Sequence, residues 1–279
     1  MGDASRIVLL HGVVDAFDPA GALVDRTLVE HRALEQYLAA RRPFVPWDEV
    51  PDGSGDILTI DDATRAGAEA CRIAVSLGHA VTFFVNPKNI ADGQVYFFTV
   101  LSAAIDTSRC TSVTHRGVDY PLSSPSMRLT FRRTMKAVLL DCPGEEERER
   151  ELAKIVDALG VGKVVVPDHH LPITPGELRD LRDLGVRIEN HGWDHVEIAR
   201  LSVEGFREHI VRGRDWLRAH IGVPADSYAV PFGNTFVQSF QQHISGVWFL
   251  ATRDAPPAQY AERCWNRIEI SDEVQLVKV

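Results

Sequence analysis

Asp56-Ile-Leu-Thr-Ile-Asp-Asp62 is the stretch that decides the fold, because an apolar strand ends there in two adjacent carboxylates. A helical segment follows at 63–77, with Gly78 as its stop, and Ala80-Val-Thr-Phe-Phe-Val85 then has the pattern of a second strand. This second strand is apolar on both faces, which is typical of a central strand in a parallel sheet. A strand–helix–strand rhythm of roughly 25 residues predicts a parallel α/β sheet or barrel.

The same rhythm is found nearer the two ends of the chain. Strands are expected at 6–12, 163–166, 186–189, 227–230 and 246–252, and helices at 25–42 and 202–221. Thr174, Pro175 and Glu177 have the pattern of a helix start with a capping box.

The rhythm is interrupted in the middle of the chain. Two helices are expected at 128–140 and 145–159 and a loop at 109–126, while periodicity does not decide whether 95–101 belongs to a helix or an aromatic lid. The sequence therefore predicts a single domain, 1–279, with a mostly helical insertion at about 86–160.

Two histidines point to a metal site. In Arg187-Ile-Glu-Asn-His-Gly-Trp-Asp-His195, His191 and His195 lie four residues apart after a short strand. That spacing puts both on one face of a helical turn, where two nitrogens can reach one ion. A divalent metal that does chemistry takes a third protein ligand and keeps a position open for water.

The carboxylates at 61 and 62 are the candidates for the third ligand. In a parallel barrel the C-terminal ends of the strands lie on one face, where active sites are built. Neighbouring side chains point in different directions, so one of Asp61 and Asp62 can bind metal while the other faces the water.

Four segments in this order resemble the motifs of the polysaccharide deacetylases, the NodB-homology or carbohydrate esterase 4 type. They are Leu58-Thr-Ile-Asp-Asp62, Ala80-Val-Thr-Phe-Phe-Val85, His191-Gly-Trp-Asp-His195 and Tyr228-Ala-Val-Pro-Phe-Gly233. The resemblance covers roughly 50–90 and 160–275. It implies a deformed (β/α)7 barrel and a divalent metal, usually zinc, held by Asp62, His191 and His195, with Asp61 as the general base.

The sequence departs from the family pattern in three places. Ile60 and Ala63 stand where an aromatic residue and a glycine are usual. Ala229 stands where an arginine is common, and we expect Arg267 to pair with Asp61 instead. The C-terminal Leu-x-x-His element that usually supplies the general acid is not recognisable, which leaves His11, His169 and His170 as candidates.

Further residues are expected around the substrate. Pro231, Phe232, Gly233 and Arg267 are assigned to substrate binding, with a backbone N–H near Phe232 as a donor to the oxyanion. Trp193 is assigned there too, although simple packing is an equally good interpretation. The run Asp168-His-His170 looks metal-binding, but neighbouring side chains diverge, so we expect only one of its histidines to face a pocket. Asp194 is expected to cap or orient rather than to bind metal.

Composition narrows the partners and the compartment. The net charge of −9, from 39 acidic and 30 basic residues, argues against a duplex-binding surface, so no nucleic-acid partner is expected. Four scattered cysteines without a Cys-x-x-Cys pair fit a reducing compartment. No apolar run is long enough for a membrane span and no signal peptide is recognised, so a cytoplasmic location is expected. The oligomeric state does not follow from the sequence.

The expected function is that of a metal-dependent hydrolase. A metal-activated water, with Asp61 as base, would remove an N-acyl group, expected to be acetyl, from an amino-sugar-containing small molecule or glycan precursor. The missing acid and Ala229 motivate one alternative, a catalytically silent barrel that binds saccharide or metal. A second alternative keeps the same metal site for deformylation or for hydrolysis of a non-sugar amide.

Overall fold

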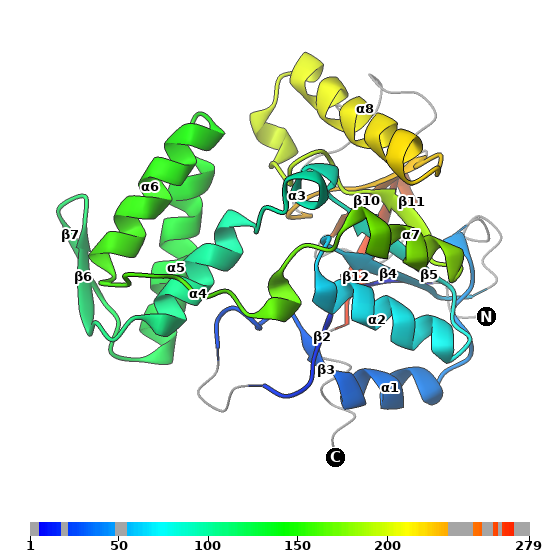
Figure 1. Ribbon diagram of the computed structural model, residues 1–279, viewed down its shortest axis with the longest axis horizontal. Coiled ribbons are helices and arrows are strands. Elements are labelled where there is room, and N and C mark those ends of the chain that lie inside the picture. Colours follow the sequence, from blue (N-terminus) through cyan, green and yellow to red (C-terminus); the bar gives the residue numbers. More distant parts are fainter. Residues whose placement is uncertain are drawn as a thin grey trace. The chain divides into compact units, whose positions relative to one another are not determined.

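The computed structural model describes residues 6–17, 22–47, 55–233, 248–252, 259–261 and 264–270. It divides the chain into two compact units, which Figure 1 draws as ribbons. Unit 1 consists of Met1–Ala16, Thr27–Gln94 and Pro172–Val279. Unit 2 consists of Phe17–Arg26 and Val95–Leu171, so it takes in most of the segment expected as an insertion and adds a piece from near the N-terminus.

Unit 1 is a deformed α/β barrel, as the sequence predicted. Seven parallel strands follow one another around it, and pairing of the last with the first closes the ring. In that order the strands are β1 (Ile7–Leu10), β4 (Ile57–Asp61), β5 (Val81–Val85), β8 (Arg187–Asn190), β9 (Ser227–Ala229), β10 (Trp248–Thr252) and β12 (Cys264–Glu269). The deformation is clearest between β8 and β9, where only Asn190 and Tyr228 are paired. A short strand, β11 (Gln259–Ala261), runs antiparallel to β12.

Helices cover the outside of the barrel strands (Figure 1). They are α1 (His31–Ala39), α2 (Arg65–Ser76), α3 (Pro87–Asp92), α7 (Pro175–Asp183) and α8 (Val203–His220). A short 3-10 helix, η3 (Ile198–Arg200), precedes α8. The predicted capping box at the start of α7 is present, with Thr174 and Glu177 each bonded to the other's backbone. A two-residue parallel pair, β2 (Val13–Val14) and β3 (Val29–Glu30), precedes α1.

Strand β4 shows how the sequence directs a carboxylate into the barrel. Leu58 and Ile60 pack in the core beneath the helices, whereas Ile57 packs with residues of other strands in a separate cluster. Because alternate side chains of a strand point to opposite faces, Thr59 and Asp61 share the face of Ile57. Asp61 therefore enters the inside of the barrel.

Unit 2 is built from three helices and a hairpin. The helices are α4 (Phe97–Thr107), α5 (Pro125–Leu140) and α6 (Glu145–Ala158), and the hairpin joins β6 (Ser112–His115) to β7 (Val118–Pro121). A single 3-10 turn, η2 (Asp168–His170), lies close to the end of the unit. The segment at 22–26 belongs to the same core, because Leu23 packs in it and Asp106 accepts hydrogen bonds of 3.0 Å from the amides of Leu23 and Val24.

Several expected elements differ from the observed ones. Residues 163–166 form no strand, and Val165 is 66 % exposed; a short apolar run alone cannot distinguish a barrel strand from a connecting segment. The loop expected at 109–126 contains the β6–β7 hairpin, and the undecided aromatic segment leads into α4.

Two expected boundaries also change. The helix expected from 25 begins only at His31, because a turn and β3 precede it. Of the strand expected at 246–252, residues 248–252 form β10, and 246–247 lie outside the described residues. Within the described parts of the chain, no helix has the length and apolar character that a membrane span requires.

Candidate metal centre

Asp62, His191 and His195 meet in unit 1 with their ligand atoms within 4.8 Å of one another. The Oδ1 atom of Asp62 lies 3.3 Å from Nε2 of His195 and 3.7 Å from Nε2 of His191. In a tetrahedral site with bonds of about 2.0–2.1 Å, ligand atoms lie about 3.3–3.4 Å apart. The separations are thus those of ligands arranged around an ion.

Positive φ angles turn the chain at two of these residues. Asp62 follows β4 with φ 66°, a left-handed conformation that Asp tolerates better than most residues. His195 has φ 55°, and Gly192 between the histidines has φ 85°. The histidines therefore lie on a loop and not on the helical turn that their spacing suggested. His191 extends the ladder of β8 by donating its amide to the carbonyl of Val85 at 2.8 Å.

A hydrogen bond fixes the orientation of the His191 ring. Its Nδ1 lies 2.9 Å from the carbonyl oxygen of Ala229, which can only accept, so Nδ1 carries the hydrogen. In the neutral ring Nε2 then presents its lone pair towards Asp62 and His195. Burial lowers the pKa of His191 to about 4, with the charges of Asp61 and Asp62 opposing that effect, so the ring is neutral at pH 7. Metal-binding histidines are commonly held in this way.

The carboxylate of Asp62 has an oxygen for a cation. Its Oδ1 is buried and has no hydrogen-bond partner among the described residues. Burial raises the pKa of Asp62, but the neighbouring His195, His11 and His191 outweigh it, and the net pKa is lowered. An ionised carboxylate oxygen beside two imidazole nitrogens is the donor set that zinc takes in proteins, so these three residues fit a divalent metal.

Asp61, unlike the adjacent Asp62, is paired with an arginine. Arg267 of β12 donates from Nη1 to Oδ1 and from Nη2 to Oδ2, each at 2.6 Å, and Nη1 also reaches Oγ1 of Thr59 at 3.3 Å. The expected pairing of Arg267 with Asp61 is therefore present, and the arginine is 1 % exposed. Burial raises the pKa of Asp61, but Arg267 and His191 outweigh burial, so the carboxyl is held ionised.

The histidine loop is held by residues that the sequence analysis did not single out. Asn86, just after β5, donates from Nδ2 to the carbonyl of His191 at 2.7 Å and to that of Gly192 at 3.2 Å. Asn190 accepts from the Gly192 amide at 2.8 Å. A Cβ at position 192 would lie 2.0 Å from Nε2 of His209, so only glycine fits there. An asparagine directly after a buried strand is a sequence signal that could have pointed to Asn86.

Of the other residues expected at the site, one contacts a candidate metal ligand and the others lie around the metal centre. The ring of Phe232 packs edge-on against His195, with centroids 4.6 Å apart, and Pro231 and Gly233 flank it. The guanidinium of Arg212 lies over the ring of Trp193, 3.9 Å from its centroid, in a cation–π contact, and a role of Trp193 in substrate binding stays a prediction. Asp194 lies 3.3 Å from Nδ1 of His209 and is not among the three converging ligands.

The three candidate acids lie in different units. His11 follows β1 in unit 1, and its charge lowers the pKa of both Asp61 and Asp62. His169 and His170 belong to unit 2, where both contact Asp25. The two neighbouring side chains therefore converge on one carboxylate, although they were expected to diverge; which of them faces a pocket stays a prediction.

The fold and the site define an α/β barrel with an Asp-His-His cluster at the C-terminal ends of its strands. The family model for polysaccharide deacetylase matches residues 54–243, and the chain belongs to that family. The search of curated proteins found no match.

Solved structures support the same fold. The deacetylase PplD from Streptococcus pyogenes, solved with acetate, aligns with a TM-score of 0.60 at 12 % identity, over 99 % of this chain and 97 % of that one. IcaB from Ammonifex degensii aligns at 0.55 and 14 % identity, over 98 % of each chain. A polysaccharide deacetylase from Bacillus cereus aligns at 0.56 and 12 % identity, over 99 % of this chain and 68 % of that one.

Proposed function

We propose that this protein is a metal-dependent hydrolase that removes an N-acyl group, with acetyl expected, from an amino-sugar-containing small molecule or glycan precursor. The observation that carries the proposal is the convergence of Asp62, His191 and His195 beside a carboxylate, Asp61, that a buried arginine holds in place. Membership of the polysaccharide deacetylase family supports amide hydrolysis at this site.

Each of the four residues has a separate role in this proposal. Asp62, His191 and His195 would hold the metal, for which their donor set favours Zn²⁺. When bound, the ion would supply Lewis-acid charge and lower the pKa of water towards about 7. Asp61 accepts the proton of the attacking water, and Arg267 keeps the Asp61 carboxylate ionised and oriented for that task.

For the general acid we propose His11. His11 follows β1, and β1 pairs with β4, which ends at Asp61, and with β12, which ends at Glu269. Because these strands are parallel neighbours, the three side chains lie at one end of the barrel. Nδ1 of His11 lies 3.6 Å from Oε1 of Glu269, a contact that orients the ring and leaves Nε2 to serve the leaving amine. The charge of His11 also lowers the pKa of both Asp61 and Asp62.

The test combines metal analysis with release of acetate from N-acetylated amino sugars that are free, nucleotide-linked or oligomeric. Asp62→Ala, His191→Ala and His195→Ala should each lose activity and the metal held at the barrel centre. Asp61→Asn and His11→Gln should keep the metal and lose turnover. Full activity in a metal-free preparation would contradict the proposal.

Two outcomes would point to the alternatives. Saccharide binding without release of acid would favour a silent barrel, and release of formate or turnover of a non-sugar amide would favour a different bond at the same site. A cytoplasmic location stays a prediction from composition.

A further inference from the structure

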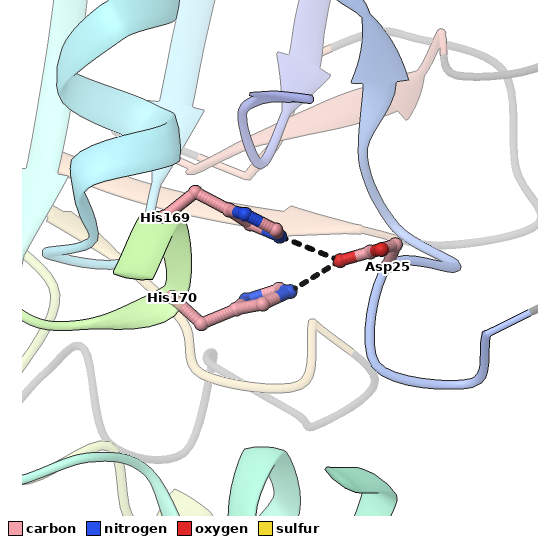
Figure 2. Close-up of side chains that lie close together, drawn as sticks. All are labelled: Asp25, His169 and His170. Atoms are coloured by element: carbon pink, nitrogen blue, oxygen red, sulfur yellow. Dashed lines mark hydrogen bonds and ion pairs between the residues drawn. The ribbon is translucent and has the colours of Figure 1, made fainter. Parts of the chain in front are cut away.

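A second cluster of one aspartate and two histidines lies wholly within unit 2. Figure 2 shows the carboxylate of Asp25 between the edges of the two imidazole rings. Oδ1 of Asp25 lies 2.7 Å from Nε2 of His169 and 2.8 Å from Nε2 of His170. The rings are 4.5 Å apart between centroids and inclined at 48°, so both present the same nitrogen to one point.

The chain brings these residues together from distant positions. His169 and His170 are the last two residues of η2, and Asp25 precedes them by 144 and 145 residues. Asp25 is held close by its own segment, since Asp106 binds the two preceding amides and Leu23 packs in the core of unit 2. The convergence is thus a property of the fold of unit 2.

Charge and burial at the cluster favour a cation. Asp25 is 7 % exposed and His170 6 %. Burial raises the pKa of Asp25, but the hydrogen bonds from His169 and His170 outweigh burial, and the carboxyl is ionised. Among the described residues, neither arginine nor lysine pairs with Asp25. Burial and, to a smaller extent, the charge of Asp25 raise the pKa of the nearby Asp106 carboxyl. A buried carboxylate is normally paired or binds a metal.

We propose that Asp25, His169 and His170 form a second divalent-metal site, with Zn²⁺ as the ion that the donor set favours. One carboxylate oxygen and two imidazole Nε2 atoms are a zinc ligand set, and all three ligand atoms lie within 4.8 Å of one another. The side chain of His169 is 29 % exposed, so an ion could reach the cluster from that side.

Metal binding changes the hydrogen bonding of the cluster in a defined way. The observed 2.7 and 2.8 Å are hydrogen-bond lengths, shorter than the roughly 3.3–3.4 Å between ligands of a tetrahedral zinc. Both Nε2–H protons must leave, the neutral rings take their hydrogen on Nδ1, and the ligand atoms separate by about 0.6 Å. The ion then links the segment at 22–26 to that at 95–171, so it should stabilise unit 2 because it binds only the folded unit.

The experiment counts zinc in the full chain after loading with Zn²⁺ and removal of the excess. The wild type should retain two equivalents. Asp25→Asn and His170→Ala should each retain one, Asp62→Ala should retain one, and the double variant Asp25→Asn/Asp62→Ala none. Asp168→Asn is the matched control from the same turn and should retain two. Asparagine at position 25 can still accept hydrogen bonds from His169 and His170. This variant therefore separates metal binding from an alternative in which the three residues are only hydrogen-bonded to one another.

A stability measurement gives a second readout on the Asp62→Ala background, where the barrel site is disabled. Zn²⁺ at a hundredfold excess over its dissociation constant should raise the midpoint of thermal unfolding by about 5–10 °C. The double variant should show no such rise. The proposal is overturned if Asp62→Ala retains no zinc, or if its zinc survives Asp25→Asn and His170→Ala. Neither result bears on the proposed barrel site, whose zinc content is measured separately in the Asp25→Asn variant.

Discussion

Removing the positive charge of Arg267 should disable the barrel centre without removing any proposed metal ligand. The replacement Arg267→Met keeps most of the side-chain volume, so it leaves a smaller cavity than alanine. It deprives both oxygens of Asp61 of their donors. The carboxylate would then be buried without a partner and would be driven towards its neutral form, in which it cannot accept a proton.

The size of the effect follows from the burial of the pair. The side chains of Arg267 and Asp61 are 1 % and 4 % exposed, so the small values for surface ion pairs do not apply. Breaking a buried pair by removing one partner costs about 3–5 kcal/mol. Two charge-assisted hydrogen bonds at about 1.5–3 kcal/mol each give a similar figure. We therefore expect the free energy of unfolding to fall by about 3–5 kcal/mol.

The assay is urea unfolding of Arg267→Met, Asp61→Asn and the double variant, with zinc content and acetate release measured in parallel. Because the two residues contact each other, the double variant should be less destabilised than the sum of the single variants, by about 2–3 kcal/mol. Arg267→Lys keeps the charge without the two-pronged geometry and should be intermediate in stability and turnover. Full turnover by Arg267→Met, or additive effects in the double variant, would refute the reasoning.

Three further predictions follow from other parts of the structure. Gly192→Ala places a Cβ 2.0 Å from His209 at φ 85°, so we expect a loss of at least about 2 kcal/mol in stability and weaker zinc binding at the barrel centre, measured by unfolding and metal titration. Glu151 of α6, buried beside His115, Arg116 and Lys154, has a pKa that burial raises but Lys154 and Arg116 lower overall. Its ionised form therefore stabilises unit 2 at pH values above the ordinary pKa of 4.5. The wild type should be more stable than Glu151→Gln near pH 7, and this difference should vanish as acid protonates Glu151. An unchanged difference at low pH would be contrary evidence. Thr174→Ala removes the side chain that caps α7, and thermal unfolding should show a loss of about 1 kcal/mol, with Thr174→Ser close to the wild type.

Most of the barrel could be predicted because its strands are buried on both faces. Strands β1, β4 and β5 each form a short run in which apolar residues dominate. Strand β8 has Ile188 as its one apolar residue, and its position directly before the histidine motif indicated it. Strand β12 could not be recognised in that way, because its Arg267 points into the barrel. That arginine is compatible with a barrel strand only because Asp61, 206 residues earlier, neutralises it. The opposite error arose at 163–166, where an apolar run lies outside any strand.

The residues of the candidate centre could be named from their motifs, but their conformation could not. The spacing of His191 and His195 fits a helical turn, whereas the observed loop depends on Gly192 and on hydrogen bonds from Asn86. The Asp25 cluster was even less accessible, because no local pattern links an aspartate to a histidine pair 144 residues away.

Adjacent aspartates can take different roles at this centre because one of them is already neutralised by the protein. Both oxygens of Asp61 accept hydrogen bonds from Arg267, so the charge of this carboxylate is already balanced, while each oxygen keeps a lone pair that can accept a proton. Asp62 leaves the strand at φ 66° and brings an oxygen with no hydrogen bond to two imidazole nitrogens. The arginine comes from β12 and not from position 229. Position 229 then needs no charged side chain, and its contact with His191 is made by the backbone carbonyl, which any residue provides, so the departure at Ala229 is compatible with an intact centre.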